Sequence, residues 1–247
     1  MLSLVGLGIG DGKSIAVEGL DLIKNAKHIF IENYTAEISA NKLEWLQNEA
    51  NSEITVLSRE EVEEPNLLLD KAKDSDVVLL VEGDPLSATT HNSLKNQCKS
   101  NQIEFNVVHG SSILTIAAGL VGLQHYKFGP TATLVMREGN YEPKSPLEKI
   151  KANIEHGYHT LVLLDIKKDN PEEKGKTMSA TEGLQQISQE IDNENLACVI
   201  ERAGYNDSKV IVGKISELID QKFGETPHSI IIPGDLHFAE KEAIEQL

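Results

Sequence analysis

Short apolar runs alternate with segments in which apolar residues recur at helical spacing. In the first half, the runs predict strands at residues 2–7, 28–31, 54–57, 77–81 and 103–108. Between them, Ile15, Leu20, Ile23 and Ala26 share one side of a predicted helix, and further helices are predicted at 42–50, 66–73, 86–99 and 112–123. Residues 77–81 are apolar throughout, which is typical of a strand buried on both faces of a parallel sheet. The alternation predicts such a sheet with helices on both faces.

The second half has a different order of elements. Strands are predicted at residues 131–136, 160–165, 196–201, 210–212 and 229–232, and helices at 146–156, 180–191, 215–223 and 238–247. The strands at 196–201 and 210–212 are joined by a connection too short for a helical crossover, so they should pair antiparallel. The second half therefore predicts a mixed sheet.

These patterns predict an α/β protein of two domains. Phe128-Gly129-Pro130 is the expected linker, which gives domains at residues 1–127 and 128–247. A length of 247 residues suits two compact domains, each with its own core. The lysine-rich stretch at 167–176 is expected to be a mobile surface loop.

Composition narrows the classes of partner. The formal net charge of -16 repels phosphate backbones, which disfavours nucleic acid as the main partner. The charge favours solubility and would also suit a basic protein surface. No apolar run approaches the roughly 20 residues of a membrane span. Cys98 and Cys198 stand alone in the sequence, which predicts a reduced, cytoplasmic protein without a zinc or redox site.

The glycine-rich loop after the first strand approaches two phosphate-binding motifs and fulfils neither. A dinucleotide fingerprint starting at Gly6 needs glycine where Asp11 stands, and a phosphate loop ending at Lys13-Ser14 needs glycine where Leu7 stands. Glu32 ends the second strand, where a ribose-binding carboxylate is expected in dinucleotide-binding proteins. NAD or nucleotide binding therefore stays open, beside a simpler interpretation in which the glycines let the backbone approach another ligand.

Two more loops follow strands that should end at the same edge of the sheet. In Gly83-Asp84-Pro85, glycine permits a tight turn, and Asp84 is placed to cap a helix starting near Leu86. In the loop at 109–113, a serine is expected to cap the next helix. Capping and ligand binding remain alternatives for both loops. The chain has no G-x-S-x-G or H-E-x-x-H motif, which removes the usual hydrolase and metalloprotease signatures.

Taken together, these motifs resemble the tetrapyrrole-methylase-like superfamily, and within it the diphthine synthases. The superfamily has G-x-G after its first strand and G-D-P after its fourth. The matching stretches span the whole chain, at residues 57–60, 83–91, 122–129, 138–141, 159–167, 202–204 and 233–234. G-D-P-L-S-A-T-T-H and H-T-L-V-L-L-D-I-K are the most specific of them, and the short length resembles the archaeal form.

The resemblance implies a non-Rossmann (class III) methyltransferase with S-adenosyl-L-methionine in the cleft between two α/β domains and S-adenosyl-L-homocysteine as product. It implies repeated methylation of the amino group of 3-amino-3-carboxypropyl-histidine on translation elongation factor 2, in diphthamide biosynthesis. It also implies a cytoplasmic homodimer without a metal. The cofactor-binding positions that carry over are Ile9, Asp84, Ser87, Ser112, Ile113, Leu163, Ala203 and His228.

No catalytic residue is assigned, because a sulfonium donor is already activated and the protein mainly has to align the reactants. His91 and Asp165 are possible proton acceptors, with structural roles as the alternative. Two rival functions remain: a nucleotide-dependent oxidoreductase or kinase, and a methylase of corrin precursors. The net charge of -16 disfavours an anionic macrocycle, and the incomplete motifs disfavour the nucleotide enzymes.

Overall fold

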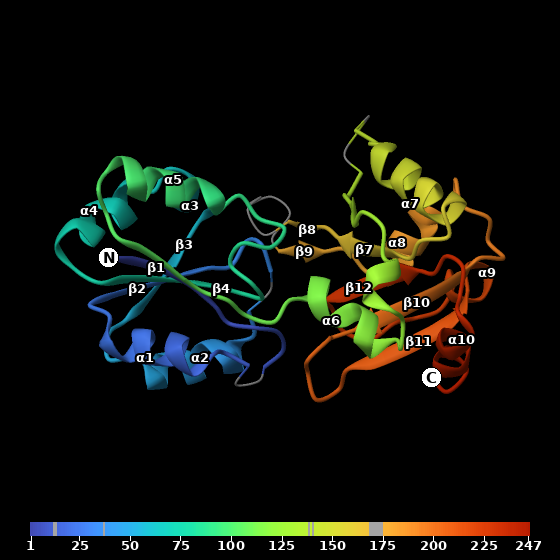
Figure 1. Cartoon of the computed structure of the whole chain (residues 1–247), viewed down its shortest axis with the longest axis horizontal. Coiled ribbons are helices and arrows are strands. Elements are labelled where there is room, and N and C mark those ends of the chain that lie inside the picture. The colour runs from blue at the N-terminus through green and yellow to red at the C-terminus, as the bar shows by residue number, and fades with distance from the viewer. Residues whose placement is uncertain (12–13, 37, 138, 140, 168–174) are drawn as a thin grey trace. The chain divides into compact units, whose positions relative to one another are not determined.

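The computed structural model describes residues 1–11, 14–36, 38–137, 139, 141–167 and 175–247 (Figure 1). Contacts divide the chain into two compact units. The first contains Met1–Ile113, and the second contains Leu114–Ile166 and Lys176–Leu247. The boundary expected from the sequence, after residue 127, stays a prediction. Each unit is built on its own five-stranded sheet.

The sheet of the first unit is entirely parallel, as predicted. Its strands are β1 (Leu2–Gly6), β2 (His28–Glu32), β3 (Ile54–Leu57), β4 (Val77–Val81) and β5 (Phe105–Val108), in the order β3-β2-β4-β1-β5. Helices α1 (Val17–Asn25) and α2 (Ala40–Glu49) cover one face, and α3 (Arg59–Glu63), α4 (Asn66–Asp74) and α5 (Asn92–Ser100) cover the other (Figure 1).

Alternation along the strands divides the core of this unit into two layers. Val5, Ile31 and Leu80 pack with Ile23 of α1 and Leu46 of α2. The alternate residues of the same strands, among them Leu4, Phe30 and Leu79, lie on the other face of the sheet and pack against α4 and α5. Because both faces are buried, the strands show the continuous apolar runs seen in the sequence.

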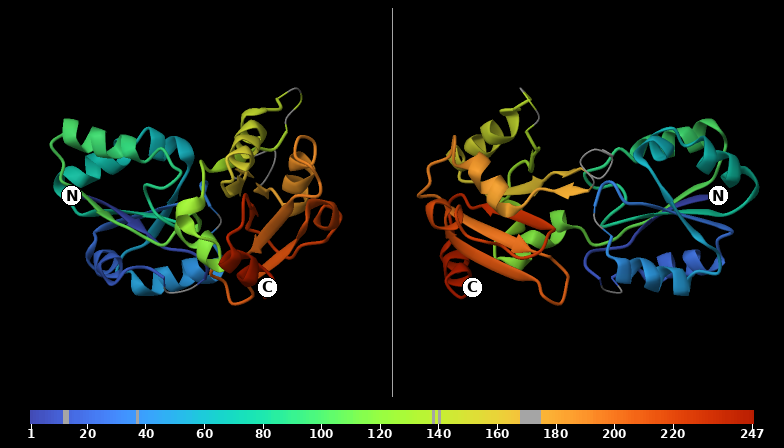
Figure 2. Two further views of the ribbon diagram at one scale, coloured as in Figure 1. Left: turned by 45° about the vertical axis from the view of Figure 1, so that its right-hand side comes forward. Right: turned by 180° about the vertical axis from the view of Figure 1, so that it is seen from behind.

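The second unit contains a mixed sheet, again as predicted. Its strands are β6 (Ala132–Leu134), β7 (Thr160–Leu164), β10 (Leu196–Glu201), β11 (Lys209–Lys214) and β12 (His228–Ile232), in the order β11-β10-β12-β7-β6. The expected antiparallel pairing of β10 with β11 is confirmed, and only β6 and β7 run parallel. The helical elements are α6 (Ile113–Leu120), the 3-10 helix η1 (His125–Lys127), α7 (Ser145–Glu155), α8 (Ala180–Ile187), α9 (Ile215–Leu218) and α10 (Phe238–Ile244) (Figure 2).

Local structure differs from the prediction at three places. The helix expected from residue 86 begins at Asn92, because Ala88 has a φ of 55°, which a right-handed helix does not tolerate. Helix α3 was not predicted, although Ser58 and Glu61 form a capping box at its start. The ends of the expected loop at 167–176 pair as β8 (Ile166–Lys167) and β9 (Lys176–Thr177).

Other sequence expectations concern the cysteines and membrane association. Cys98 and Cys198 are buried and unpaired, and burial raises the pKa of the Cys198 thiol to about 12. Both therefore serve as small core residues. None of the helices in the described part of the chain has the length and apolar character needed to cross a bilayer. Gly12, Lys13, Glu138, Asn140 and residues 168–174, which belong to motifs or loops discussed above, lie outside the described residues.

Candidate functional site

The loops after β1, β4 and β5 come together because β1 lies between the other two strands. The first two are joined by a pair of backbone hydrogen bonds: the Gly8 N–H donates to the Gly83 carbonyl at 3.1 Å, and the Gly83 N–H donates to the Gly8 carbonyl at 2.8 Å. In open α/β sheets, ligands bind beyond these carboxyl ends. The geometry therefore singles out this edge of the first unit.

Glycines make this approach of backbones possible. A Cβ atom on Gly6 would lie 2.6 Å from the Gly110 nitrogen and 2.7 Å from the Gly83 oxygen, and one on Gly110 would overlap the Gly83 oxygen. Gly8 and Gly83 have φ angles of 66° and 72°, in the left-handed region that favours glycine. The glycines thus satisfy a steric requirement of three converging loops. The same feature suits a ligand that lies directly on the backbone.

Asp84 organises its own loop, but it does not cap the next helix. Its Oδ1 accepts hydrogen bonds from the Leu86 N–H at 3.0 Å and the Ser87 hydroxyl at 2.9 Å, and its Oδ2 lies 2.7 Å from Nδ1 of His109. Burial alone would raise the pKa of Asp84, but the hydrogen bonds from these three residues hold it below its usual value. Asp84 is therefore an ionised carboxylate at the candidate site.

A buried ion pair between Lys42 and Glu82, which the sequence did not predict, lies next to the Gly83-Asp84 turn. Lys42 of α2 is 1% exposed, and its Nζ lies 2.9 and 2.8 Å from the two carboxylate oxygens of Glu82 and 3.5 Å from the Gly8 carbonyl. Burial raises the pKa of Glu82 to about 7, although Lys42 acts in the opposite direction. In the sequence, Lys42 resembles any lysine on an amphipathic helix, and no spacing rule pairs it with Glu82.

Glu32 is occupied in a way that disfavours ribose binding. Its buried carboxylate accepts hydrogen bonds from the backbone N–H groups of Tyr34 and Thr35 at 3.0 and 3.1 Å and from the Thr35 hydroxyl. The order of strands points the same way, because β4 separates β2 from β1, whereas these strands are neighbours in dinucleotide-binding folds. Both observations disfavour a dinucleotide-dependent oxidoreductase.

His91 takes a structural position. Its Nδ1 lies 3.0 Å from the Pro85 carbonyl, which can only accept, so Nδ1 is the donor. Its Nε2 lies 3.2 Å from the Tyr34 hydroxyl, and both side chains are buried. His91 therefore links the loop after β4 to the loop after β2.

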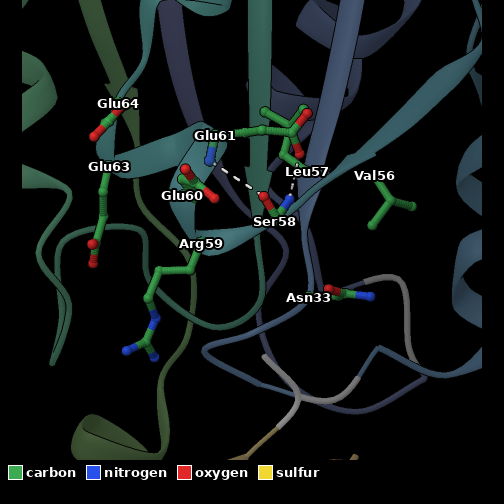
Figure 3. Close-up of a pocket in the computed structure, with 9 residues that line it drawn as sticks. All are labelled: Asn33, Val56, Leu57, Ser58, Arg59, Glu60, Glu61, Glu63 and Glu64. Atoms are coloured by element: carbon green, nitrogen blue, oxygen red, sulfur yellow. Dashed lines mark hydrogen bonds between the residues drawn. The ribbon is translucent and has the colours of Figure 1, made fainter. Parts of the chain in front are cut away.

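A surface hollow of about 630 Å³ lies next to α3 (Figure 3). It is lined by Asn33, Val56, Leu57, Ser58, Arg59, Glu60, Glu61, Glu63 and Glu64. Figure 3 shows the Glu61 backbone N–H donating a hydrogen bond to the Ser58 hydroxyl among the residues that line the hollow. None of the eight positions assigned to a cofactor lines this hollow, so it is distinct from the converging loops.

The structure places the eight positions at two edges, one in each unit. Ile9, Asp84, Ser87, Ser112 and Ile113 belong to the three converging loops of the first unit; Ser112 is buried and the other four are partly exposed. In the second unit, Leu163 on β7 is opposite Ser229 on β12, and His228 is opposite Glu201 on β10. Ala203 lies two residues beyond Glu201, so these three positions share one edge of the mixed sheet.

His228 carries an unusual polar atom at this second edge. The residue is 5% exposed, and its Nδ1 accepts a hydrogen bond from the backbone N–H of Ala180 at 3.0 Å. Its Nε2 is buried and makes no hydrogen bond of acceptable geometry among the described residues, although the backbone of Gly224 and Glu225 is close enough to raise the pKa of the ring. Burial has the larger effect and lowers the pKa of the imidazole, which favours the neutral ring. A buried polar atom without a partner is rare and fits a ligand contact.

Asp165, the other possible proton acceptor, supports the backbone. Its Oδ2 accepts a hydrogen bond from the Met136 N–H at 2.9 Å, and its carbonyl accepts one from the Met178 N–H at 2.9 Å. Asp165 therefore has a structural role in connecting β7 to the segments at Met136 and Met178. Across the described residues, no three His, Cys, Asp or Glu side chains are grouped so as to hold a metal ion.

Comparison with known proteins gives a consistent result over the whole chain. The family model of tetrapyrrole (corrin/porphyrin) methylases matches residues 1–219. Diphthine synthases of Methanococcus maripaludis and Methanocaldococcus jannaschii are each 41% identical to the chain, and each match covers 100% of the chain and 98% of the relative.

Solved structures agree with the sequence comparison. A crystal structure of diphthine synthase is 32% identical, with a TM-score of 0.88, over 99% of this chain and 94% of that one. A conserved hypothetical protein from Aeropyrum pernix K1 is 25% identical, with a TM-score of 0.86, over 100% of this chain and 88% of that one. The two-unit α/β fold is thus shared along the full length of the chain.

Proposed function

The chain belongs to the diphthine synthases of the tetrapyrrole methylase family, and from this premise we propose that it is an S-adenosyl-L-methionine-dependent N-methyltransferase of translation elongation factor 2. Its substrate is the 3-amino-3-carboxypropyl-histidine of that factor, whose amino group it methylates repeatedly to give diphthine. The observation that carries the proposal is the convergence of three loops, distant in sequence, at one edge of the parallel sheet. Five of the eight expected cofactor positions lie in these loops.

The residues at both edges fit a cofactor of this chemistry. The glycines of the first unit keep side chains away from the backbone, and Asp84 offers a negative charge beside it. The second unit offers the unpartnered Nε2 of His228 beside the backbone at Leu163 and Ala203. Contact of one cofactor molecule with all eight positions remains a prediction, as does catalysis without a metal.

The cofactor supplies a methyl group already activated on a sulfonium. What remains for the protein is to hold the reactants in line and to accept the target amine in its unprotonated form, whose lone pair attacks. His91 and Asp165 are occupied by backbone partners, so neither is assigned as a base. The proton released from nitrogen passes to solvent in this proposal.

The biological setting follows from the same premise. We propose an archaeal, cytoplasmic homodimer, supported by relatives from methanogens and by two buried, unpaired cysteines. The high negative charge disfavours nucleic acid as a partner, and membrane association is not part of the proposal. Light scattering of the purified protein tests the dimer directly.

The decisive experiment is mass spectrometry of elongation factor 2 after incubation with the protein and S-adenosyl-L-methionine. Factor that carries the aminocarboxypropyl group should gain successive increments of one methyl group. Factor with an unmodified histidine is the matched control and should gain none. Equal methylation of both forms would refute the assigned substrate, and no methylation of either would refute the proposed activity.

A further inference from the structure

We propose that Lys42 is a positioning residue for cofactor binding: through its ion pair with Glu82 it holds the loops after β1 and β4 in the conformation that receives the cofactor. The inference rests on the proposed function, because it assigns a role toward the cofactor named there. Lys42 is not among the eight positions of the family resemblance. It lies on α2, outside all three converging loops.

The geometry connects three segments through one ammonium group. Lys42 Nζ contacts both carboxylate oxygens of Glu82, at 2.9 and 2.8 Å, and the carbonyl of Gly8 at 3.5 Å. Glu82 directly precedes the Gly83-Asp84 turn, and Gly8 directly precedes Ile9. A side chain anchored in a helix therefore holds the two loops that carry Asp84 and Ile9.

Stability alone is a poor explanation for this pair. Lys42 is 1% exposed and Glu82 is nearly buried, so both charges are removed from water. Desolvation of such a pair offsets most of its Coulomb attraction, and replacement of both partners by hydrophobic side chains of similar volume is often neutral or stabilising. The carboxylates of Glu32 and Asp11 face Glu82 as well, and their repulsion raises its pKa further. The pair is therefore better explained by the geometry that it enforces.

The loops need such an anchor because they are rich in glycine. Gly8 and Gly83 both occupy left-handed backbone conformations, and glycine loses more conformational freedom than other residues when it is fixed. If the loops were ordered only on binding, the entropy loss would weaken cofactor affinity. A buried anchor fixes them beforehand.

The test compares two double variants. Lys42→Met with Glu82→Gln removes both charges and preserves size. Lys24→Met with Glu49→Gln is the matched control, because that pair joins α1 to α2 at 3.2 Å on the surface of the same unit. Calorimetric titration with S-adenosylhomocysteine and amide hydrogen exchange are measured on the wild type and both variants.

We expect the Lys42/Glu82 variant to fold and to bind S-adenosylhomocysteine at least about tenfold more weakly, because the loops must then be ordered at the expense of binding free energy. The Gly8 and Gly83 amides should exchange faster, while Leu4 and Leu79 in the strands keep their protection. The control should match the wild type in both measurements. If the double variant does not fold, Glu82→Asp, which keeps both charges but shortens the reach to Lys42, should show a smaller loss in both measurements.

Native affinity together with native glycine protection, in whichever variant folds, overturns the proposal. Failure of the wild type to bind S-adenosylhomocysteine counts against the proposed function instead. The exchange measurement needs no ligand, so it decides the role of Lys42 in the loops in either case.

Discussion

The buried imidazole of His159 donates a hydrogen bond from Nε2 to the buried carboxylate of Glu240, at 3.1 Å, across 81 residues of sequence. The direction follows from the other ring nitrogen, since Nδ1 accepts from the Gly234 N–H at 3.0 Å. Glu240 also accepts from Lys127 Nζ and from the backbone N–H groups of Gln124 and His237. These interactions of Glu240 thus connect helix α10 to the start of β7 and to the segment around η1.

This network predicts acid sensitivity. Burial would raise the pKa of Glu240, but the hydrogen bonds of Lys127 and the backbone outweigh it and hold the pKa at about 2. In the unfolded chain the pKa of this carboxyl is near 4.5, so its lower pKa in the folded protein stabilises the fold at every pH above 4.5. This stabilisation is lost as the pH falls from 4.5 toward 2. Urea unfolding at several pH values should show the loss, and Glu240→Gln should remove that part of the pH dependence.

At neutral pH, Glu240→Gln should reduce the free energy of unfolding by roughly 1.5–3 kcal/mol, because hydrogen bonds to an ionised group are lost. Glu242→Gln, at an exposed position of the same helix, is the control and should leave stability and its pH dependence unchanged. An unaltered acid transition in Glu240→Gln would contradict this assignment.

Asp84→Asn tests the charge at the first edge. Asparagine keeps an oxygen for the Leu86 N–H and the Ser87 hydroxyl, so the melting temperature should stay close to that of the wild type. S-adenosylhomocysteine should bind at least several-fold more weakly in titration calorimetry, because a charge-assisted contact is worth about 1.5–3 kcal/mol. His109→Gln removes the imidazole beside Asp84 but keeps the carboxylate and its bonds to Leu86 and Ser87, so it is the control and should bind with nearly native affinity. Native affinity in Asp84→Asn would reduce this residue to a turn former.

Two substitutions of His228 test the roles of its two ring nitrogens separately. In His228→Asn, the side-chain oxygen can replace Nδ1 as acceptor for Ala180, while the position of Nε2 is lost. The fold should persist and S-adenosylhomocysteine affinity should fall about tenfold, if Nε2 makes one hydrogen bond to the ligand. His228→Gln lacks an acceptor at Nδ1 and should lower the melting temperature. Equal affinity of wild type and His228→Asn would remove this residue from the site.

Glycine-to-alanine substitutions should have opposite effects at Gly110 and Gly119. At Gly110, a Cβ atom would overlap the Gly83 carbonyl, so alanine should lower the melting temperature and weaken binding of S-adenosylhomocysteine. At Gly119, an exposed position in α6, no atom lies within 4 Å of a new Cβ. Alanine there should stabilise the protein by roughly 0.5–1 kcal/mol through helix propensity. Differential scanning calorimetry measures both, and equal effects would contradict the steric argument.

Periodicity predicted most of the fold because both units bury their strands. Residues 77–81 are apolar for this reason, and the short connection before β11 required the antiparallel pair. The start of α5 could not be predicted, because the left-handed Ala88 is set by its surroundings rather than by its own preference. Helix α3, by contrast, has a local signal in the sequence, because Ser58 and Glu61 have the S-x-x-E spacing of a capping box.

The candidate site was predictable to a smaller extent. Glycines and turn residues mark loops, so Asp84 and Gly83 could be located from the sequence. The ion pairs Lys42–Glu82 and Lys127–Glu240 could not, because the partners lie 40 and 113 residues apart and no local pattern links them. The unpartnered nitrogen of His228 depends on packing from several elements, which only coordinates reveal.

The central place of β1 constrains how the first unit is made on the ribosome. The strand is the first of its sheet to be synthesised, yet its two neighbours begin at Val77 and Phe105. Until residue 108 has left the exit tunnel, one or both edges of this apolar strand lack a partner. Contacts between segments so distant in sequence form slowly, and unpaired strand edges promote association with other chains. The nascent first unit is therefore a predicted client of chaperones that shield hydrophobic segments during translation.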